Sequence, residues 1–342
     1  MQETKTGKVL DLTLLFRVIA FAKPYKKQFI IATISAILLS FLGPIRPMLI
    51  NYAIDNFIII SDPENLLKIT VLLIALLFCE GFIQFFYIYL STWIGQNVIL
   101  DLRKKIFKHI VSLKMSYFDK TPIGTLVTRA VSDIETIADI FSQGLLVIIA
   151  ELLKLVIVIF FMFYTDWRLS IIALLTIPIL LVATAWFKRN IKASFQAVRD
   201  KVSSINSFVQ EHIVGMNIVQ IFNREKAEFE KFKQINSEHR DAHLRSIFYY
   251  AVFFPVVEVL SAVSIGLVVW YGGEGIISGK DITIGEIIAF ILFIQMMFRP
   301  IRQLADRFNV LQMGIVGSER VFRVLDTDDK INDEGKIEVA DL

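Results

Sequence analysis

The sequence has a single cysteine, Cys79, among 342 residues, and only 20% of its residues are charged. One cysteine excludes internal disulfides and metal sites built from several cysteines. Because Cys79 lies within an apolar run, we expect a buried thiol that packs as a small apolar side chain. The net charge is only +3, and no basic stripe is interleaved with aromatic residues, so nucleic acid is not an expected partner.

The chain also lacks a phosphate-binding loop of the form G-x-x-x-x-G-K-[ST]. The Gly-Lys pairs at Gly7, Gly279 and Gly335 have neither the preceding glycine nor the following Ser or Thr. We therefore expect no ATP binding by this route, no catalytic residues and no cofactor held by the chain itself. His239 and His243 have the spacing of a helical metal site, but no second ligand pair is apparent, which favours a solvated helix face.

Apolar residues, by contrast, are abundant. They make up 55% of the chain, and the mean hydropathy is +0.60, which is too apolar for a soluble globular protein of this size. Stretches long enough to cross a bilayer recur along the whole sequence. Six spans are predicted, starting near Ile30, Leu66, Leu145, Leu169, Ile247 and Ile284.

The positions of the basic residues predict the orientation of these spans. Lysine and arginine concentrate in residues 1–27, 96–143, 188–246 and 299–342, so the positive-inside rule places both termini in the cytoplasm. The opposite connections are short, and the glycine-rich stretch from Gly272 to Asp281 is expected to be one of them.

The cytoplasmic connections are too long and too regular to be loops. No proline occurs from Leu66 to Leu113, and 48 residues of helix extend about 70 Å, against a hydrocarbon core of about 30 Å. Apolar residues recur there at helical spacing, which predicts that the helices continue into water as a packed bundle. The stripes are Ile99, Leu102, Ile106, Ile110 and Leu113; Val127, Ile134 and Phe141; Phe195, Val198, Val202, Ile205 and Val209; and Ile301, Leu304, Phe308, Leu311 and Ile315.

Two distal segments interrupt these helices: KMSYFDKTPIG at residues 114–124, the first tip, and EHIVGMNIVQIFNRE at residues 211–225, the second tip. Tyr117 and Phe118 in the first tip form a docking site if uncovered. The alternative is that they fold back under the bundle and plug the turn. The second tip remains apolar as it crosses its most distal point.

These two tips, with GSERVFRVLD at residues 317–326, resemble the transmembrane domain of bacterial ABC exporters. The likeness covers nearly the whole chain and is closest to the multidrug and lipid-flippase-like branch of half-transporters. It implies an all-α membrane fold of the type-1 exporter kind, with six long helices that extend into the cytoplasm. It also implies a cytoplasmic N-terminus with an elbow helix (1–26), the six-helix domain (27–325) and a linker into an ATPase domain (326–342).

The resemblance further implies residue roles and partners. Tyr117, Phe118, Asp119 and Gly124 match the first coupling helix of the family. Gly215, Val219, Phe222 and Asn223 match the second. Expected partners are the lipid membrane, a second transmembrane half, identical or different, and nucleotide-binding domains that hold ATP and Mg²⁺. This chain departs from the family by ending at Leu342, and Gly335–Leu342 resembles the first strand of an ATPase domain, so that domain is expected to be truncated or separately encoded.

Ionisable residues inside spans suggest where a substrate binds. Arg46 lies between Pro44 and Pro47, and Glu80 and Gln84 share one helix face. We hypothesise a central cavity lined by these three polar residues, with an adaptable apolar wall on the last span formed by Gln295, Met296, Met297 and Phe298. The alternative for the apolar residues is plain lipid or core packing. Glu151 and Lys154 are equally well explained as a structural ion pair.

The sequence therefore predicts the membrane part of an ATP-driven exporter of drugs, lipids or peptides in the bacterial cytoplasmic membrane. Two other classes stay open. A secondary transporter is expected to show Gly- or Pro-interrupted spans in matching positions of two repeats, whereas only the first span is strongly interrupted. A non-transporting scaffold that binds a soluble partner is the third.

Overall fold

The long apolar runs form helices in the computed structural model, which describes the backbone of residues 12–330. Side chains are described over the same range, except at 12, 145, 301–306, 308 and 309. The strand predicted over 335–342 and three positions of the last apolar stripe lie outside the described residues. Apart from one isolated bridge between Leu113 and Lys330, the described elements are helices. The all-α expectation is confirmed.

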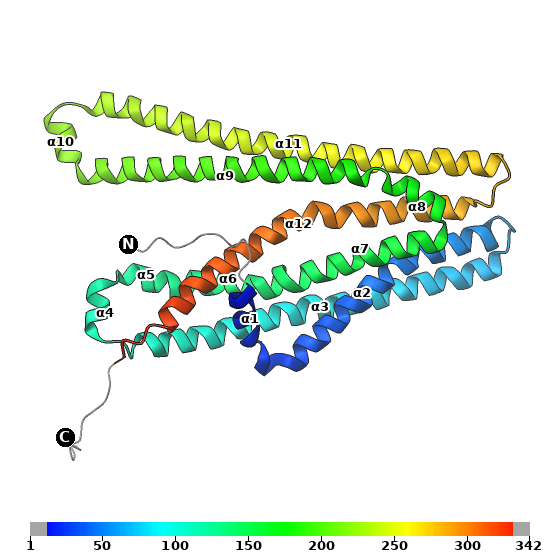
Figure 1. Ribbon diagram of the computed structural model, residues 1–342, viewed down its shortest axis with the longest axis horizontal. Helices are drawn as coiled ribbons and strands as arrows, with labels where there is room; N and C mark the ends of the chain where they lie inside the picture. The colour runs from blue at the N-terminus through cyan, green and yellow to red at the C-terminus, as the bar shows by residue number, and fades with distance from the viewer. Residues whose placement is uncertain (1–11, 331–342) are drawn as a thin grey trace, which may run out of the picture. The chain divides into compact units, whose positions relative to one another are not determined.

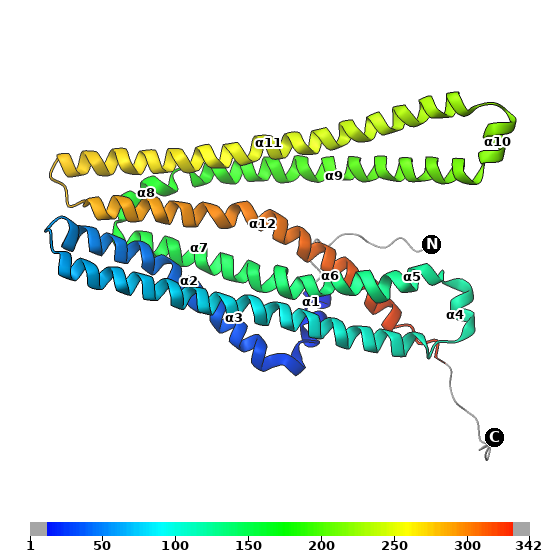
Figure 2. The ribbon, with the colours of Figure 1, turned by 180° about the vertical axis from the view of Figure 1, so that it is seen from behind.

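The chain divides into two compact units, Met1–Phe161 with Arg299–Leu342, and Met162–Phe298, and each is described by itself. In the first unit α2 and α3 run side by side (Figures 1 and 2). The described elements of this unit are α1 (Leu12–Ala20), η1 (Lys23–Tyr25), α2 (Lys26–Ala53), η2 (Ile54–Ile58), α3 (Pro63–Ile110), α4 (Met115–Lys120), α5 (Ile123–Thr128), η3 (Arg129–Asp133), α6 (Ile134–Asp139), η4 (Ile140–Gly144), most of α7 (Leu145–Thr165) and the C-terminal part of α12 (Ile284–Leu325).

Helix α3 shows why the absence of proline is informative. It is continuous over 48 residues, the predicted length, and begins where the Asp62 side chain accepts a hydrogen bond from the Asn65 amide at 3.2 Å. Only 6% of its most apolar window is buried within the chain. Cys79 is accordingly exposed, and the expectation of a buried thiol was wrong because the apolar run forms an outward, lipid-type surface rather than a core.

Five helices of the described residues are long and apolar enough to cross a membrane. They correspond to the first five predicted spans. Helix α12, the predicted sixth, is continuous over 42 residues, although several of its side chains are not described. Pro44 and Pro47 lie inside α2 without ending it.

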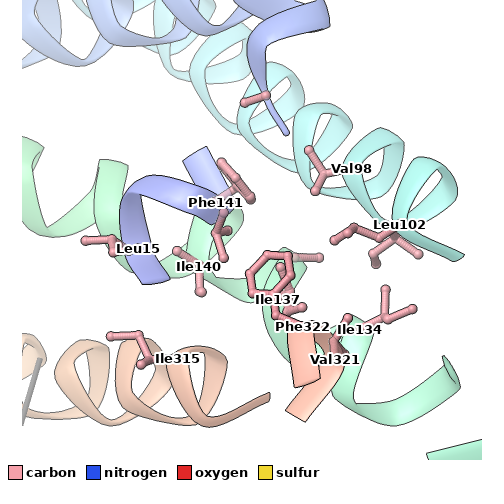
Figure 3. Packing of buried hydrophobic residues seen from close by; sticks show 14 of the residues in the cluster. Leu15, Val98, Leu102, Ile134, Ile137, Ile140, Phe141, Ile315, Val321 and Phe322 are labelled. Carbon is pink, nitrogen blue, oxygen red and sulfur yellow. The ribbon is translucent and has the colours of Figure 1, made fainter. Parts of the chain in front are cut away.

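The core of the first unit lies where the helices continue beyond their most apolar stretches. Leu102 and Ile106 on α3, and Ile134 on α6, are fully buried. Figure 3 shows Leu102 and Ile134 converging with side chains from α1, η4 and the end of α12. The predicted stripe on α3 is therefore confirmed. Val127 is the exception in the neighbouring stripe, because it is exposed on α5 while Ile134 and Phe141 are buried.

Helix α1 belongs to this core. Its existence matches the predicted elbow helix, but Leu15 and Val18 are buried in the same cluster as Phe322. Arg17 donates two hydrogen bonds to Asp326, one of 2.7 Å, and its guanidinium lies 4.2 Å from the centre of the Phe322 ring. The apolar face of α1 is therefore covered by the protein, and its polar side is tied to the end of α12.

Replacing Arg17 by alanine is expected to weaken this attachment by up to about 1 kcal/mol, because both partners of the ion pair are roughly half exposed. The hydrogen bonds from Arg17 lower the pKa of Asp326 below its ordinary value. A lowered pKa in the folded state stabilises the fold above the unfolded pKa of about 3.9, and this contribution is lost as pH falls through the folded pKa. A double-mutant cycle with Asp326→Ala at pH 7 and pH 3 measures it. Arg323→Ala, which breaks a pair within α12, is the control, and equal coupling at both pH values contradicts the assignment.

The second unit is dominated by the antiparallel pair α9 and α11, which lie side by side (Figures 1 and 2). Its elements are the end of α7, α8 (Trp167–Leu174), α9 (Ile177–Val214), α10 (Met216–Ile221), α11 (Glu225–Ile277) and the start of α12. The rings of Phe187 and Phe253 stack at 4.1 Å, and the Ser194 and Ser246 hydroxyls are hydrogen-bonded at 2.6 Å. These contacts hold α9 against α11.

The buried face of α9 matches the predicted stripe only in part. Phe195, Val202 and Val209 are exposed, so that part of the prediction was wrong. Val198 is buried as the stripe predicted, together with Phe187, Ile191 and Ser194, which the stripe did not include. Small and aromatic residues set this face, because Ser194 allows the close approach to Ser246 that a large side chain would prevent.

The glycine-rich connection was also predicted too long. Helix α11 continues through Gly272 and Gly275 to Ile277. A Cβ at Gly272 would lie 2.7 Å from Ile287, and one at Gly275 would lie 2.7 Å from Ile282. These glycines therefore provide room for helix packing. The turn itself uses Gly279, whose φ of +69° suits glycine.

Candidate functional site

The first unit contains a cavity of about 550 Å³ lined by residues of α2, α3, α6, η4, α7 and the C-terminal part of α12. One face of α3 supplies polar side chains at helical spacing. The polar residues that line the cavity are Ser40, Glu80, Gln84, Tyr87, Ser91, Thr92, Gln96, Asp139, Ser142, Gln143, Glu151, Lys154 and Arg307. A space of this size, with acidic and basic groups, can accommodate the polar part of a small ligand.

The structure brings together part of the predicted cavity. Glu80 and Gln84 both line it. Arg46 is not a lining residue, but its guanidinium lies 3.5 Å from the Glu80 carboxylate. Arg46 therefore neutralises the Glu80 carboxylate without itself lining the cavity. The spacing of Glu80 and Gln84 on one helix face was enough to identify the contribution of α3 to the cavity. The prolines on either side of Arg46 were enough to identify the ion-pair partner of Glu80.

The predicted apolar wall is not part of this cavity. Met297 and Phe298 are fully buried and do not line this cavity. Gln295 is exposed and Met296 is half buried, and neither lines the cavity. The alternative of core packing holds for Met297 and Phe298, because methionine and phenylalanine fill core space as readily as they line a binding site.

Several cavity residues were missed or undervalued. Glu151 and Lys154 both line the space, and the described part of the chain contains no ion pair between them. Tyr87, Asp139 and Arg307 were not singled out. The spacing of Glu80, Gln84, Tyr87 and Ser91 along one face of α3 could have extended the prediction, but Asp139 and Arg307 reach the cavity only through tertiary packing.

The first tip has its aromatic residues folded inward. Tyr117 and Phe118 are half buried against the core cluster, with their ring centres 6.0 Å apart. The structure thus favours the alternative in which they plug the turn. Met115 and Ile123 are the exposed apolar residues here, 75% and 70% exposed. Asp119 and Gly124 are exposed as well.

The first tip is also joined to the segment that follows α12. The Lys114 amide donates a hydrogen bond to the Asp329 carbonyl at 2.8 Å, and Leu113 pairs with Lys330 in an isolated antiparallel bridge. Residues 329 and 330 therefore lie against the residue that precedes α4. Sequence reasoning could not have found this contact, because it joins backbones more than 200 residues apart.

The second tip has an exposed apolar surface. Ile218, Ile221 and Phe222 on and beside α10 are 64%, 78% and 70% exposed, while Val219 is half buried. Asn223 has a φ of +48°, a left-handed conformation that asparagine tolerates better than most residues. It lets the chain turn from α10 into α11. Gly215 ends α9.

A histidine connects the two helices behind this surface. The His212 Nδ1 lies 2.7 Å from the Phe208 carbonyl and its Nε2 lies 3.1 Å from the Glu228 carboxylate. Lys231 also donates to Glu228, at 2.8 Å. These contacts link α9 to α11 next to α10. They therefore hold together the two helices that carry the exposed apolar surface.

Comparison with known proteins gives the family. Residues 29–301 match the family described as the ABC transporter transmembrane region. The uncharacterized ABC transporter ATP-binding protein YknV of Bacillus subtilis is 29% identical over 94% of this chain and 53% of its own length. ATP-dependent lipid A-core flippases of Syntrophus aciditrophicus and Desulfotalea psychrophila are 27% and 25% identical over 91% of the chain.

The chain spans about half the length of these curated relatives, 51% and 54% for the two flippases. The family match covers both tips and every residue that lines the cavity except Arg307. It agrees with the resemblance drawn from the tip motifs. The chain belongs to the family of ABC transporter transmembrane regions.

Proposed function

We propose that the chain is the membrane domain of an ATP-driven exporter in a bacterial cytoplasmic membrane, with both termini in the cytoplasm. It acts with a second membrane half and with ATPase domains that dock on the two tips. Those domains bind ATP and Mg²⁺, since the chain's own sequence contains no phosphate-binding loop. The cargo is hydrophobic or amphipathic.

The observation that carries this proposal is the second tip. Ile218, Ile221 and Phe222 form an exposed apolar surface at the end of helices of 38 and 53 residues. Apolar residues grouped at the end of a polar helical hairpin are typical of a docking surface for another protein. The relatives' names, which refer to ATP binding and to an ATP-dependent flippase, support ATP as the energy source.

The long helices supply a physical route from the docking surface to the membrane. At about 1.5 Å per residue, α9 is about 57 Å long and α11 about 80 Å. A rigid helix displaced at one end carries the motion along its length, and the Phe187–Phe253 stack with the Ser194–Ser246 hydrogen bond keeps the two helices moving together. Movement of a domain docked on the second tip would thereby displace the membrane-spanning parts of α9 and α11.

The test is reconstitution of the chain with its ATPase domain in liposomes. We expect a fluorescent amphiphile to move across the bilayer only when ATP is hydrolysed. Movement driven by an ion gradient without nucleotide contradicts the proposal and identifies a secondary transporter. Binding of the ATPase domain without any movement of amphiphiles also contradicts it and identifies a scaffold.

A further inference from the structure

The cavity of the first unit contains charges in an unusual place. Helix α7 has only two charged residues, Glu151 and Lys154, in an otherwise apolar stretch of 21 residues. An ionised side chain in the middle of a membrane helix costs about 2.5 to 3.5 kcal/mol. Glu151 and Lys154 are three residues apart and both line the cavity, so the polar interior of the cavity offsets part of this cost.

The cavity charges differ in whether the protein neutralises them. Glu80 has an ion-pair partner in Arg46, and Arg307 donates a hydrogen bond to Gln143 at 3.2 Å. For Glu151, Lys154 and Asp139, the last of which lies where this cavity meets the second one, the described residues provide neither an ion pair nor a side-chain hydrogen bond. A carboxylate and an ammonium one helical turn apart therefore both face the cavity without a partner from the protein.

The Tyr87 hydroxyl is a further unsatisfied group in the cavity. Its oxygen is buried and has no hydrogen-bond partner in the structure. Tyr87 lines the same cavity as Glu151 and Arg307. A buried polar group without a partner costs about 1 to 3 kcal/mol, and a ligand that hydrogen-bonds to Tyr87 removes that cost.

The rest of the lining fits a ligand that is polar at one end. Ala36, Leu39, Val147 and Ala150 supply an apolar part of the wall. In the other direction the cavity shares Thr92, Gln96, Asp139 and Ser142 with a second polar cavity of about 310 Å³. From Glu80 to Gln96 the polar face of α3 extends about 24 Å and forms a polar path along the helix.

We propose that this cavity binds the head group of a zwitterionic amphiphile, with its ammonium at Glu151 and its anionic group at Lys154 and Arg307. The proposal rests on the proposed function only in taking the ligand to be cargo. A ligand with both charges satisfies both unpaired side chains, whereas a ligand with one charge leaves the opposite side chain without a partner. The apolar tail lies along the apolar part of the wall.

The experiment measures direct binding to the full chain in an uncharged maltoside detergent, without ATP. The probe is radiolabelled lysophosphatidylethanolamine. Competitors are lysophosphatidylglycerol, which has only the anion, and dodecylamine, which has only the cation. We expect the zwitterion to bind about tenfold more tightly than either. A long-chain α-amino acid, which combines ammonium and carboxylate, tests the second source of the same chemistry, and whichever zwitterion binds more tightly identifies the anionic group.

Two variants assign the charges. Glu151→Gln is expected to weaken binding of the zwitterion about tenfold while leaving lysophosphatidylglycerol unaffected, and Lys154→Gln to do so while leaving dodecylamine unaffected. Glu64→Gln and Lys68→Gln, which remove the exposed pair at the start of α3, are the matched controls and keep full affinity. If the neutral variants fail to fold, Glu151→Asp and Lys154→Arg replace them in the test. Both keep the charge, so they are expected to retain binding of the zwitterion.

Equal affinity for the three ligand classes, or unchanged affinity in both neutral variants, overturns the assignment. This result is separable from the proposed function, because binding is measured without nucleotide. Intact zwitterion binding in a protein that does not transport with ATP contradicts the exporter function alone. ATP-driven transport without head-group selectivity contradicts the cavity assignment alone.

Discussion

Replacing Gly317 by valine is expected to lower the free energy of unfolding by about 3 kcal/mol. A Cβ at Gly317 would lie 2.9 Å from the Asp133 carbonyl and would overlap the Thr136 hydroxyl. A Cβ at Gly314 would lie 2.8 Å from the Thr136 carbonyl. Backbone atoms of a helix cannot rotate away as a side chain can, so the helices must separate.

Separation here is costly because it opens the core of the first unit. Ile134 and Ile137 on one side, and Val321 on the other, are fully buried, and Figure 3 shows them packed together with Phe322. The measurement is unfolding of the purified chain in mixed micelles. Gly317→Ala is expected to lower the free energy of unfolding by less than Gly317→Val does.

Gly266 provides the matched control. It also lies inside a long helix, α11, but no heavy atom lies within 4 Å of its Cβ position. Gly266→Ala is therefore expected to be neutral or slightly stabilising, since alanine favours helix more than glycine does. If Gly317→Ala and Gly266→Ala are equally stable, α12 does not approach α6 as closely as described.

Replacing Ile221 and Phe222 together by serine is expected to reduce substrate-stimulated ATP turnover of the complete transporter at least about tenfold. Both side chains are more than two thirds exposed, so their loss changes the folding free energy by no more than about 0.5 kcal/mol. At a docking surface, loss of a central aromatic or aliphatic anchor costs about 2 kcal/mol or more of binding. The variant should therefore fold normally but no longer couple substrate binding in the membrane domain to ATP hydrolysis.

Phe229→Ala separates docking from a general effect on α11. Phe229 is also an exposed aromatic residue on this helix, about one turn beyond the end of the second tip, and Lys233 lies 4.8 Å from its ring centre. It is expected to keep wild-type turnover. Normal stimulation in the Ile221 and Phe222 double variant would show that the ATPase domain does not engage this surface.

Much of the fold follows from sequence alone, because helix length depends on local features. The absence of proline between residues 66 and 113 predicted the 48-residue helix α3 to within three residues at each end. The stripe of Leu102 and Ile106 predicted which side of it is buried. The stripe on α9 was right for Val198 but missed Ser194, which is also buried, because no hydropathy pattern selects a serine for burial.

The cavity was predictable only in part for a similar reason. Glu80 and Gln84 share a helix face, which the helical period determines. Asp139 and Arg307 reach the same space from segments far apart along the chain. No local pattern carries that information.

The sequence by itself determined the membrane class, the long helices and the positions of the two tips, because proline, charge and apolar runs act locally along the chain. Tertiary structure alone decided three features. Tyr117 and Phe118 turn inward while Phe222 remains exposed, α1 joins the core through Leu15 and Val18, and Glu151 and Lys154 face a cavity rather than each other. Each depends on which helices meet, and that is set by the close fit of distant side chains and glycines.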